Sequence, residues 1–424
     1  MTLLPLPDQQ IVRIVVGTSV RKSLSILQAF LQSLDRQELP PRTSLIPAFV
    51  PDFTPEQADA QAYLFQWVNE RGGTLIHGAP ANSRDFSDAP GLPTHEWQPS
   101  AMARVGHNKN RIIQFAVEQK ADYLWLADSD LILDRTSLAS LLSCERHIVT
   151  GVYWTQWSAA KTETGRNDAG PQVWLQHPYQ LEGRGMDAAE FRTKLLSREL
   201  VRVWGFGANT LIDRKALEAG VSFEFLPDVP MTGLMAGEDR HFSIRCERMH
   251  IDAWADCWPD IFHIYHAATD VPKIPAMVER LSQDHPKQPR YGDLVSVRLR
   301  ALEPIPIGPN RVQQQMPQHV RGRLGQIAVL PEIETAIAGM TRGQTRTVSV
   351  HFPIHHPVPF LRGKTRLIEV WLIDTKPFQG PPVVDEELFI SPVGAVMDSA
   401  SYSAEQVAFS EELAQEHTRE VANG

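Results

Sequence analysis

Short apolar blocks alternate with stretches of helical hydrophobic spacing along the first third of the chain. Continuous apolar runs predict strands at 11–16, 44–50, 74–77 and 123–127. Between them, apolar residues recur every three or four positions and predict helices over 24–34, 55–71 and 101–120. This β-α-β-α-β-α-β alternation is typical of a mostly parallel, Rossmann-like sheet that is covered by helices.

The pattern continues less regularly toward residue 270. It predicts a helix over 137–142, a strand over 147–154, a strand over 201–212, a helix over 235–249 and a strand that ends near His263. Gly205 and Gly207 interrupt the 201–212 strand, and glycine in a strand indicates a bulge or the close approach of a ligand. The loops over 78–100 and 155–185 are long, and loops of that length are usually functional or disordered.

The strand over 123–127 ends in two carboxylates, Asp128 and Asp130. Ligands of open α/β sheets bind at the carboxyl ends of the strands. Carboxylate oxygens suit a hard divalent cation, which in turn can hold a diphosphate. Asp-Ser-Asp by itself is more often a turn or a helix cap, so both interpretations stand on local sequence alone.

Polar and basic residues mark the helix that leads into this strand. They are Arg104, Asn108, Lys109 and Arg111. A helix that faces solvent commonly carries such a run. Because this helix precedes the Asp128 strand, we expect these side chains to contribute to cofactor binding.

Composition and charge narrow the class of protein. The 424 residues carry a net charge of −9, which argues against a partner bound by bulk charge such as a nucleic acid. Three cysteines without CxxC spacing predict reduced thiols. The N-terminal residues lack the features of a signal peptide, and no apolar run approaches the ~20 residues of a membrane span. The expected location is cytoplasmic.

Taken together, residues 10–270 resemble nucleotide-sugar glycosyltransferases of the GT-A fold, most similar to the family 2 type. The ordered motifs are ADYLWLADSDLIL, GVYW, VWGFGANTLIDRKAL, GEDRHFSIRC and an Asp256–His263 pair. The resemblance implies a donor such as a UDP- or GDP-sugar with Mn²⁺ or Mg²⁺. Some of the same segments also resemble retaining mannosyltransferases of this fold, so inversion and retention both stay open.

The resemblance also implies roles for individual residues. Asp128, Asp130 and His263 would hold the metal, and Asp128 would also orient the ribose. Asp239 would be the general base, with Glu238 beside it. Gly205 to Gly207 would line the acceptor side.

From Arg290 onward the chain resembles an FKBP-type peptidyl-prolyl isomerase domain, most similar to that of trigger factor. The segment over 324–373 aligns without gaps and places Val329, Leu330 and Ile333 on the floor of an apolar cleft. His356 and Leu367 replace a tyrosine and a phenylalanine of the family pocket. The resemblance therefore implies peptide binding more than isomerase activity.

The expected organisation has three parts. A GT-A α/β domain spans 1–285, a smaller α+β FKBP-like domain spans 286–376, and a tail spans 377–424 with a helix over 404–421. The leading hypothesis is a metal-dependent hexosyltransferase that acts on a peptide or protein recruited by the second domain. The alternatives are a saccharide or small-molecule acceptor, or an isomerase or chaperone with a nucleotide-binding domain.

Overall fold

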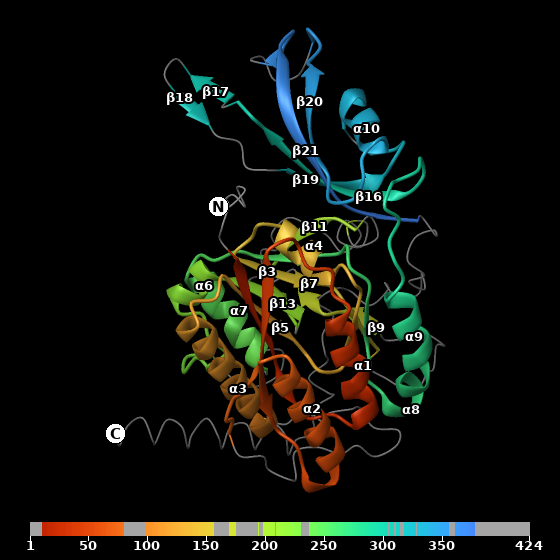
Figure 1. Ribbon diagram of the computed structural model, residues 1–424. Coiled ribbons are helices and arrows are strands. Elements are labelled where there is room, and N and C mark those ends of the chain that lie inside the picture. Colours follow the sequence, from red (N-terminus) through yellow and green to blue (C-terminus); the bar gives the residue numbers. More distant parts are fainter. Residues whose placement is uncertain are drawn as a thin grey trace, which may run out of the picture.

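The computed structural model describes residues 11–79, 99–156, 169–174, 194, 198–207, 209–229, 237–303, 305–308, 311–313, 318–327, 329–355 and 361–377. Two bodies follow one another along the chain, a larger α/β body and a smaller sheet above it (Figure 1). The predicted helix over 404–421, most of the 78–100 loop and much of the 155–185 loop lie outside the described residues. None of the described helices is long and apolar enough to cross a membrane.

A largely parallel sheet forms the centre of the larger body. Its spatial order is β11 (Leu200–Val203), β14 (Ala253–Asp256), β7 (Ile148–Gly151), β13 (Asn209–Asp213), β5 (Tyr123–Ala127), β1 (Val12–Gly17), β3 (Thr43–Pro51) and β2 (Ser19–Val20), with β4 (Thr74–Leu75) paired to β3. The predicted parallel pairing of the first strands is confirmed, because β1 pairs in parallel with both β3 and β5. The sheet is mixed beyond β5, since β13 runs antiparallel to β5 and β7.

Helices cover both faces of this sheet. The helices are α1 (Leu24–Asp35), α2 (Ala58–Glu70), α3 (Pro99–Glu118), α4 (Ser137–Ser143), α6 (Arg214–Ala219), α7 (Glu238–Arg248), α8 (Ala267–Asp270) and α9 (Ile274–Leu281), with short 3₁₀ turns η1 (Pro55–Gln57) and η3 (Val271–Lys273). One core joins α3, α6 and α7 to Val15 and Leu124, and the other joins α1, α2 and α4 to Ile14 and Trp125. Successive residues of a strand face opposite sides of the sheet, and helices bury both sides here. Positions on both sides of a central strand are therefore mostly apolar, so its sequence is a continuous apolar run.

Two predicted strands are wrong in detail. The segment over 201–212 is three strands, β11, β12 (Gly205–Phe206) and β13, which pair with β14, with β10 (Val173–Trp174) and with β5 and β7. The segment over 147–154 is divided between β7 and β8 (Trp154–Gln156). Each apolar run continues past a turn, so hydrophobicity alone does not show where one strand ends and the next begins.

A second, four-stranded sheet contains His263. Its order is β6 (Leu131–Leu133), β15 (Ile261–His263), β8 and β9 (Ala169–Pro171). β15 runs antiparallel to β6, with His263 opposite Leu131. The backbone N–H of Ile264 donates to the carbonyl of Asp130 at 2.9 Å, which closes the pairing beside the aspartate. This pairing brings the predicted metal-binding histidine to the Asp-Ser-Asp segment.

The smaller body is an antiparallel sheet with one helix. Its order is β19 (Gln318–Arg323), β16 (Leu294–Ala301), β21 (Thr365–Lys376) and β20 (Thr345–His351), and β17 (Ile305–Gly308) pairs with β18 (Arg311–Gln313). Helix α10 (Pro331–Ala338) packs on the sheet through Ile333 and Ile337, which are buried among Val297, Val350 and other core residues. Strand β16 lies inside this sheet, because it pairs with both β19 and β21.

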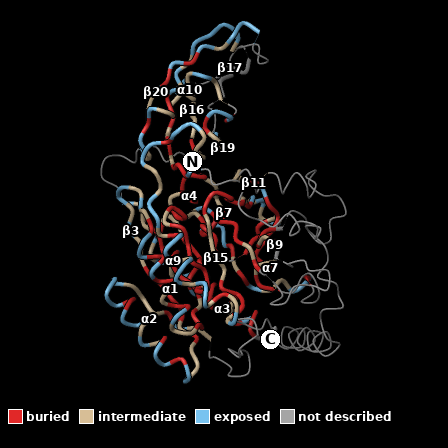
Figure 2. Tube along the Cα trace, turned by 90° about the vertical axis from the view of Figure 1, so that its right-hand side faces the viewer, coloured by how far each residue is buried: buried red, intermediate tan, exposed pale blue. Residues whose placement is uncertain are grey.

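Buried charges join the two bodies. Arg321 of β19 pairs with Asp256 of β14, with side chains 1% and 0% exposed, and Asp256 also accepts a hydrogen bond from Ser140 at 2.6 Å. Lys376, at the end of β21, lies 3.0 Å from Asp134. Thus the Asp256 of the predicted Asp256–His263 pair belongs to the interface between the bodies. Figure 2 shows that the buried residues gather in the middle of the larger body, where its strands lie.

His285, in the segment that connects the bodies, adds a titratable group to this interface. Its Nδ1 lies 2.8 Å from Asp374 and its Nε2 3.4 Å from Asp134. Burial by itself lowers the pKa of His285, but hydrogen bonds to Asp134 and Asp374 outweigh burial and raise the pKa to about 9.

We therefore expect a pH-dependent loss of stability that His285→Gln removes. A histidine whose pKa in the folded protein exceeds its unfolded value of about 6.5 adds stability, and the full contribution is present below about pH 6.5. This contribution, of the order of 3 kcal/mol, is lost as the pH rises through about 9. Urea unfolding at pH 7 and pH 9.5 measures it, and wild type should lose more stability over this interval than the variant. Equal losses would contradict the assignment.

Candidate active site

The candidate site lies where β1 and β5 end. Strand β1 ends at Gly17, and β5 ends at Ala127, directly before Asp128. Gly17 allows the close approach of two backbones here, since a Cβ at this position would lie 1.8 Å from the carbonyl oxygen of Ala48. Thr18 Oγ1 then donates to Asp128 Oδ1 at 3.1 Å. The first aspartate is therefore held by the segment that follows the neighbouring strand.

Asp130 is a buried carboxylate that faces both a lysine and a histidine. Its Oδ2 lies 2.8 Å from Lys22 Nζ, with both side chains less than a tenth exposed, and 3.5 Å from His263 Nε2. His263 Nδ1 is 2.8 Å from Thr155 Oγ1, and the imidazole packs against the ring of Tyr153. A hydrogen bond at the second ring nitrogen fixes how a histidine ring is oriented.

Helix α3 brings its buried polar residues to the same edge of the sheet. A helix that precedes a parallel strand runs opposite to it, so the N-terminal half of α3 lies at the carboxyl end of β5. Arg104 Nε donates to Asp52 Oδ2 at 3.1 Å, and Asn108 Nδ2 donates to Ser19 Oγ at 2.9 Å. Both contacts tie α3 to segments that follow β3 and β1.

Lys109 of α3 reaches the start of α7. Its Nζ donates to Glu238 Oε1 at 2.8 Å, and both residues are buried. Burial by itself lowers the pKa of Lys109, but Glu238, Asp128 and Asp239 outweigh burial and raise it, so this lysine stays protonated. Gly106 permits this contact, since a Cβ there would lie 3.1 Å from that of Glu238.

The two neighbouring acids of α7 differ in their surroundings. Burial, and then the charge of Asp239, raise the pKa of Glu238 to about 7, although Lys109 opposes the shift. Glu238 is fully covered, whereas Asp239 is half-buried. For Asp128, burial and then Asp130 raise the pKa, while Lys109, Thr18 and Lys22 oppose them. The site thus combines several buried carboxylates with several buried cations.

Three predicted site residues have other surroundings than expected. Arg111 is exposed and donates to Gln114 at 3.4 Å on the outer face of α3, so it is not brought to the site. Gly205 pairs with Trp174 in a short ladder. At Gly207 a Cβ would lie 2.6 Å from the hydroxyl oxygen of Tyr153, so the group that approaches this glycine closely is a tyrosine of the protein.

The structure adds residues that sequence reasoning missed. Arg21, Lys22 and Asp52 are buried beside the predicted residues, and Arg21 Nη1 lies 3.9 Å from Asp52 Oδ2. They follow β1 and β3. Asp128 was predicted because it is a polar residue directly after a predicted strand. The Thr18–Lys22 segment also follows a predicted strand, so the same signal in the sequence pointed to Arg21 and Lys22.

Metal ligands are only partly assembled. Among the residues that the structure describes, no three His, Cys, Asp or Glu side chains converge as a metal cluster. Asp130 and His263 do face each other, and Asp128 is held by Thr18. All three cysteines, Cys144, Cys246 and Cys257, are buried and free, which agrees with the expected reduced state.

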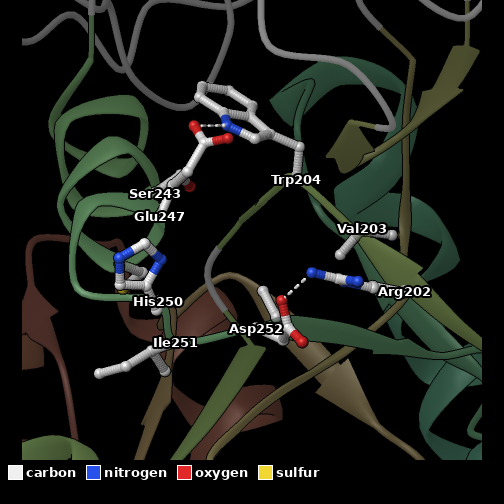
Figure 3. A pocket seen from close by; sticks show the side chains of 10 residues that line it. Arg202, Val203, Trp204, Ser243, Glu247, His250, Ile251 and Asp252 are labelled. Carbon is white, nitrogen blue, oxygen red and sulfur yellow. Dashed lines mark hydrogen bonds and ion pairs between the residues drawn. The ribbon is translucent and has the colours of Figure 1, made fainter. Parts of the chain in front are cut away.

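A cavity of about 420 Å³ lies elsewhere, between α7 and β11. Figure 3 shows Trp204 hydrogen-bonded to Glu247 on one side and Arg202 facing Asp252 on the other. The cavity includes the residues that begin β14. Strand β13 runs antiparallel to both β5 and β7, so β5 and β7 point the same way. Strand β14 is parallel to β7 and therefore also points in the direction of β5. The start of β14 is therefore at the opposite edge of the sheet from Asp128.

Comparisons with known proteins give only distant structural likenesses. No family model matches the sequence, and no curated protein matches it. The chain is similar in structure to the mannosyltransferase PcManGT from Pyrobaculum calidifontis in complex with GDP-Man and Mn²⁺, with 13% identity, a TM-score of 0.34 and coverage of 59% of this chain and 58% of that one. It is also similar to TarS from S. aureus, with 13% identity, a TM-score of 0.32 and coverage of 64% and 39%. The match spans less than two thirds of either neighbour.

Proposed function

We propose that this chain is a glycosyltransferase of the GT-A type that uses a nucleotide-sugar donor and a divalent cation. The carrying observation is the buried set of opposite charges at the ends of β1 and β5. Asp128 and Asp130 lie beside Lys22, and Lys109 bridges to the acidic start of α7. A nucleoside diphosphate brings negative charge that needs both cations and a carboxylate-held metal.

The distance between Asp130 and His263 supports a cation between them. At 3.5 Å, Oδ2 and Nε2 are too far apart for a good hydrogen bond. Two ligand atoms at right angles around an ion, each at ~2.1 Å from it, stand roughly 3 Å apart. Carboxylate oxygens suit Mn²⁺ or Mg²⁺, and Asp130 and Asp128, with His263 beside Asp130, are the residues that would hold the ion. Such an ion neutralises a diphosphate leaving group.

The protein's own groups have separate roles in this proposal. Lys22, Arg21 and Arg104 supply positive charge on the side of the β1 and β3 segments. Lys109 holds Glu238 in place at the start of α7. Asp239, which is half-buried and next to Glu238, is the group that deprotonates the acceptor hydroxyl.

The rival function is an isomerase or chaperone whose α/β body only binds a nucleotide. Incubation with UDP-, GDP- and dTDP-sugars in the presence of Mn²⁺ separates the two functions. Transfer or slow hydrolysis of one donor supports the enzyme. Binding of nucleotides without turnover of any donor supports the rival, and no binding at all contradicts both.

Asp239→Asn is expected to lower turnover by ~10²–10⁴-fold, the usual effect of losing a general base. Donor affinity should stay unchanged, because Asp239 lies in the first turn of α7, whereas the buried cations Arg21 and Lys22 follow β1. Steady-state turnover and calorimetric donor binding test this together. Loss of donor affinity with normal turnover of bound donor would show that the base is assigned to the wrong residue.

For the acceptor we propose a peptide or protein that the smaller body recruits. Half-buried Val329 and Leu330 precede α10, and Leu367 and Ile354 are exposed on the same body. Tethering an extended segment there raises its concentration near the transferase site, to about millimolar for short linkers. A saccharide or small-molecule acceptor is the alternative, with the smaller body then serving stability.

The buried interface between the two bodies limits which variants can test acceptor binding. Removing residues after 284 would take Arg321 and Lys376 away from Asp256 and Asp134, so truncation would disturb the larger body as well. Ile333 is 5% exposed and belongs to the core, so charging it would unfold the smaller body. Val329→Asp is the usable change, and Phe65→Asp, on exposed α2, is its control.

We expect Val329→Asp to weaken binding of an unfolded, proline-containing polypeptide and to leave donor hydrolysis unchanged. Phe65→Asp should alter neither. Unchanged polypeptide binding in Val329→Asp would favour the saccharide alternative.

A further inference from the structure

Lys22 and a divalent cation compete for one oxygen atom. Lys22 Nζ lies 2.8 Å from Asp130 Oδ2, and the same Oδ2 is the atom 3.5 Å from His263 Nε2. Both side chains of the Lys22–Asp130 pair are buried, at 9% and 4% exposed. An ammonium and a metal ion cannot both sit against this oxygen, because their like charges would repel at close range in a poorly solvated site.

The Lys22 side chain can leave without moving the backbone. Its segment is fixed by the parallel pairing of Ser19 and Val20 with Val50 and Pro51, and by the N–H of Asp52, which donates to the Val20 carbonyl at 2.9 Å. A lysine, by contrast, carries its charge on a flexible four-carbon stem. The backbone therefore keeps the ammonium near Asp130 while the stem lets it change partners.

Once displaced, the ammonium needs another anion. A buried cation that loses its partner is strongly unfavourable. The neighbouring carboxylates do not replace Asp130, since Asp52 pairs with Arg104, Glu238 pairs with Lys109, and Asp128 is itself proposed to hold the ion. A diphosphate that arrives with the metal supplies the missing negative charge.

We propose that Lys22 is an exchangeable counter-ion, which neutralises Asp130 in the ligand-free protein and passes to the diphosphate when a divalent cation takes its place. This inference rests on the proposed function. It adds a role for Lys22 and the sequence in which the cation and the diphosphate take their places. Metal alone binds weakly because it must displace Lys22. Metal and nucleoside diphosphate bind tightly together because the displaced ammonium gains a partner.

Lys22→Gln should change the affinities for Mn²⁺ alone and for nucleotide in opposite directions. Mn²⁺ alone should bind the variant at least about tenfold more tightly than wild type, since the competing cation is gone. UDP or GDP at saturating Mn²⁺ should bind the variant at least about tenfold more weakly, the loss expected for one charge-assisted hydrogen bond. Electron paramagnetic resonance of free Mn²⁺ and calorimetry of the nucleotides measure the two affinities without any turnover.

Two further variants keep the experiment decisive. Lys22→Arg keeps the positive charge and should bind Mn²⁺ alone as weakly as wild type, and it serves if Lys22→Gln does not fold. Lys273→Gln removes a half-exposed lysine that pairs with Asp270 and should change neither affinity. If Lys22→Gln binds both Mn²⁺ and nucleotide more weakly, or neither affinity changes, Lys22 is not exchanged. If wild type binds neither Mn²⁺ nor nucleotide, the proposed function itself fails.

Discussion

Asp130→Ala is expected to abolish metal-supported binding of a nucleoside diphosphate. Asp130 offers its Oδ2 toward His263, and its charge offsets that of Lys22. Loss of a residue that only supports a metal ligand costs 10–100-fold in affinity, so loss of the ligand itself should cost at least about 100-fold. Titration of UDP and GDP in the presence of Mn²⁺, followed calorimetrically, measures the effect.

Controls separate this effect from misfolding. Asp130→Asn keeps the size of the side chain but lacks its charge, and it should lose binding to a similar extent. Asp228→Ala removes an exposed carboxylate that pairs with Arg248 and should leave binding unchanged. Nucleotide affinity within a few-fold of wild type in a folded Asp130→Asn protein would remove Asp130 from the proposed metal site.

Arg321→Ala is expected to have the largest effect on stability. Arg321 is buried against Asp256, and its guanidinium also lies 3.3 Å from Ser140 Oγ. Deleting one member of a buried ion pair leaves the other charged and unsolvated, which costs about 4 kcal/mol. Because Arg321 belongs to the smaller body and Asp256 to the larger, the unfolding transition of both bodies should shift.

An exposed pair provides the matched control for this prediction. Arg248→Ala breaks the contact of Arg248 with Asp228, where both side chains are about half exposed or more, so the effect should be much smaller. Replacing Arg321 and Asp256 together with methionine and leucine should recover much of the loss, since no buried charge then stays unpaired. Equal effects of Arg321→Ala and Arg248→Ala would show that the interface adds little to stability.

The sequence by itself determined the first strands and helices of the larger body and the position of Asp128 at the end of a strand. Period-two and period-3.6 spacing are local properties, so the strands β1, β3 and β5 and the helices α1, α2 and α3 were predictable from residues close in sequence. Placing Asp128 at the end of β5 required only that the apolar run stop there. The same rule applies to Lys22, which follows β1 within five residues.

Only the tertiary structure decided which charges meet. Lys109 and Glu238 are 129 positions apart and join because Gly106 lets α7 approach α3. Lys22 meets Asp130 because β1 and β5 are neighbours in the sheet. Arg111 shares its helix with Arg104 but faces solvent, and Asp256 pairs with Arg321 although it stands near His263 in sequence. Burial and partner choice depend on the packing of segments far apart in the chain, and spacing along the sequence does not record it.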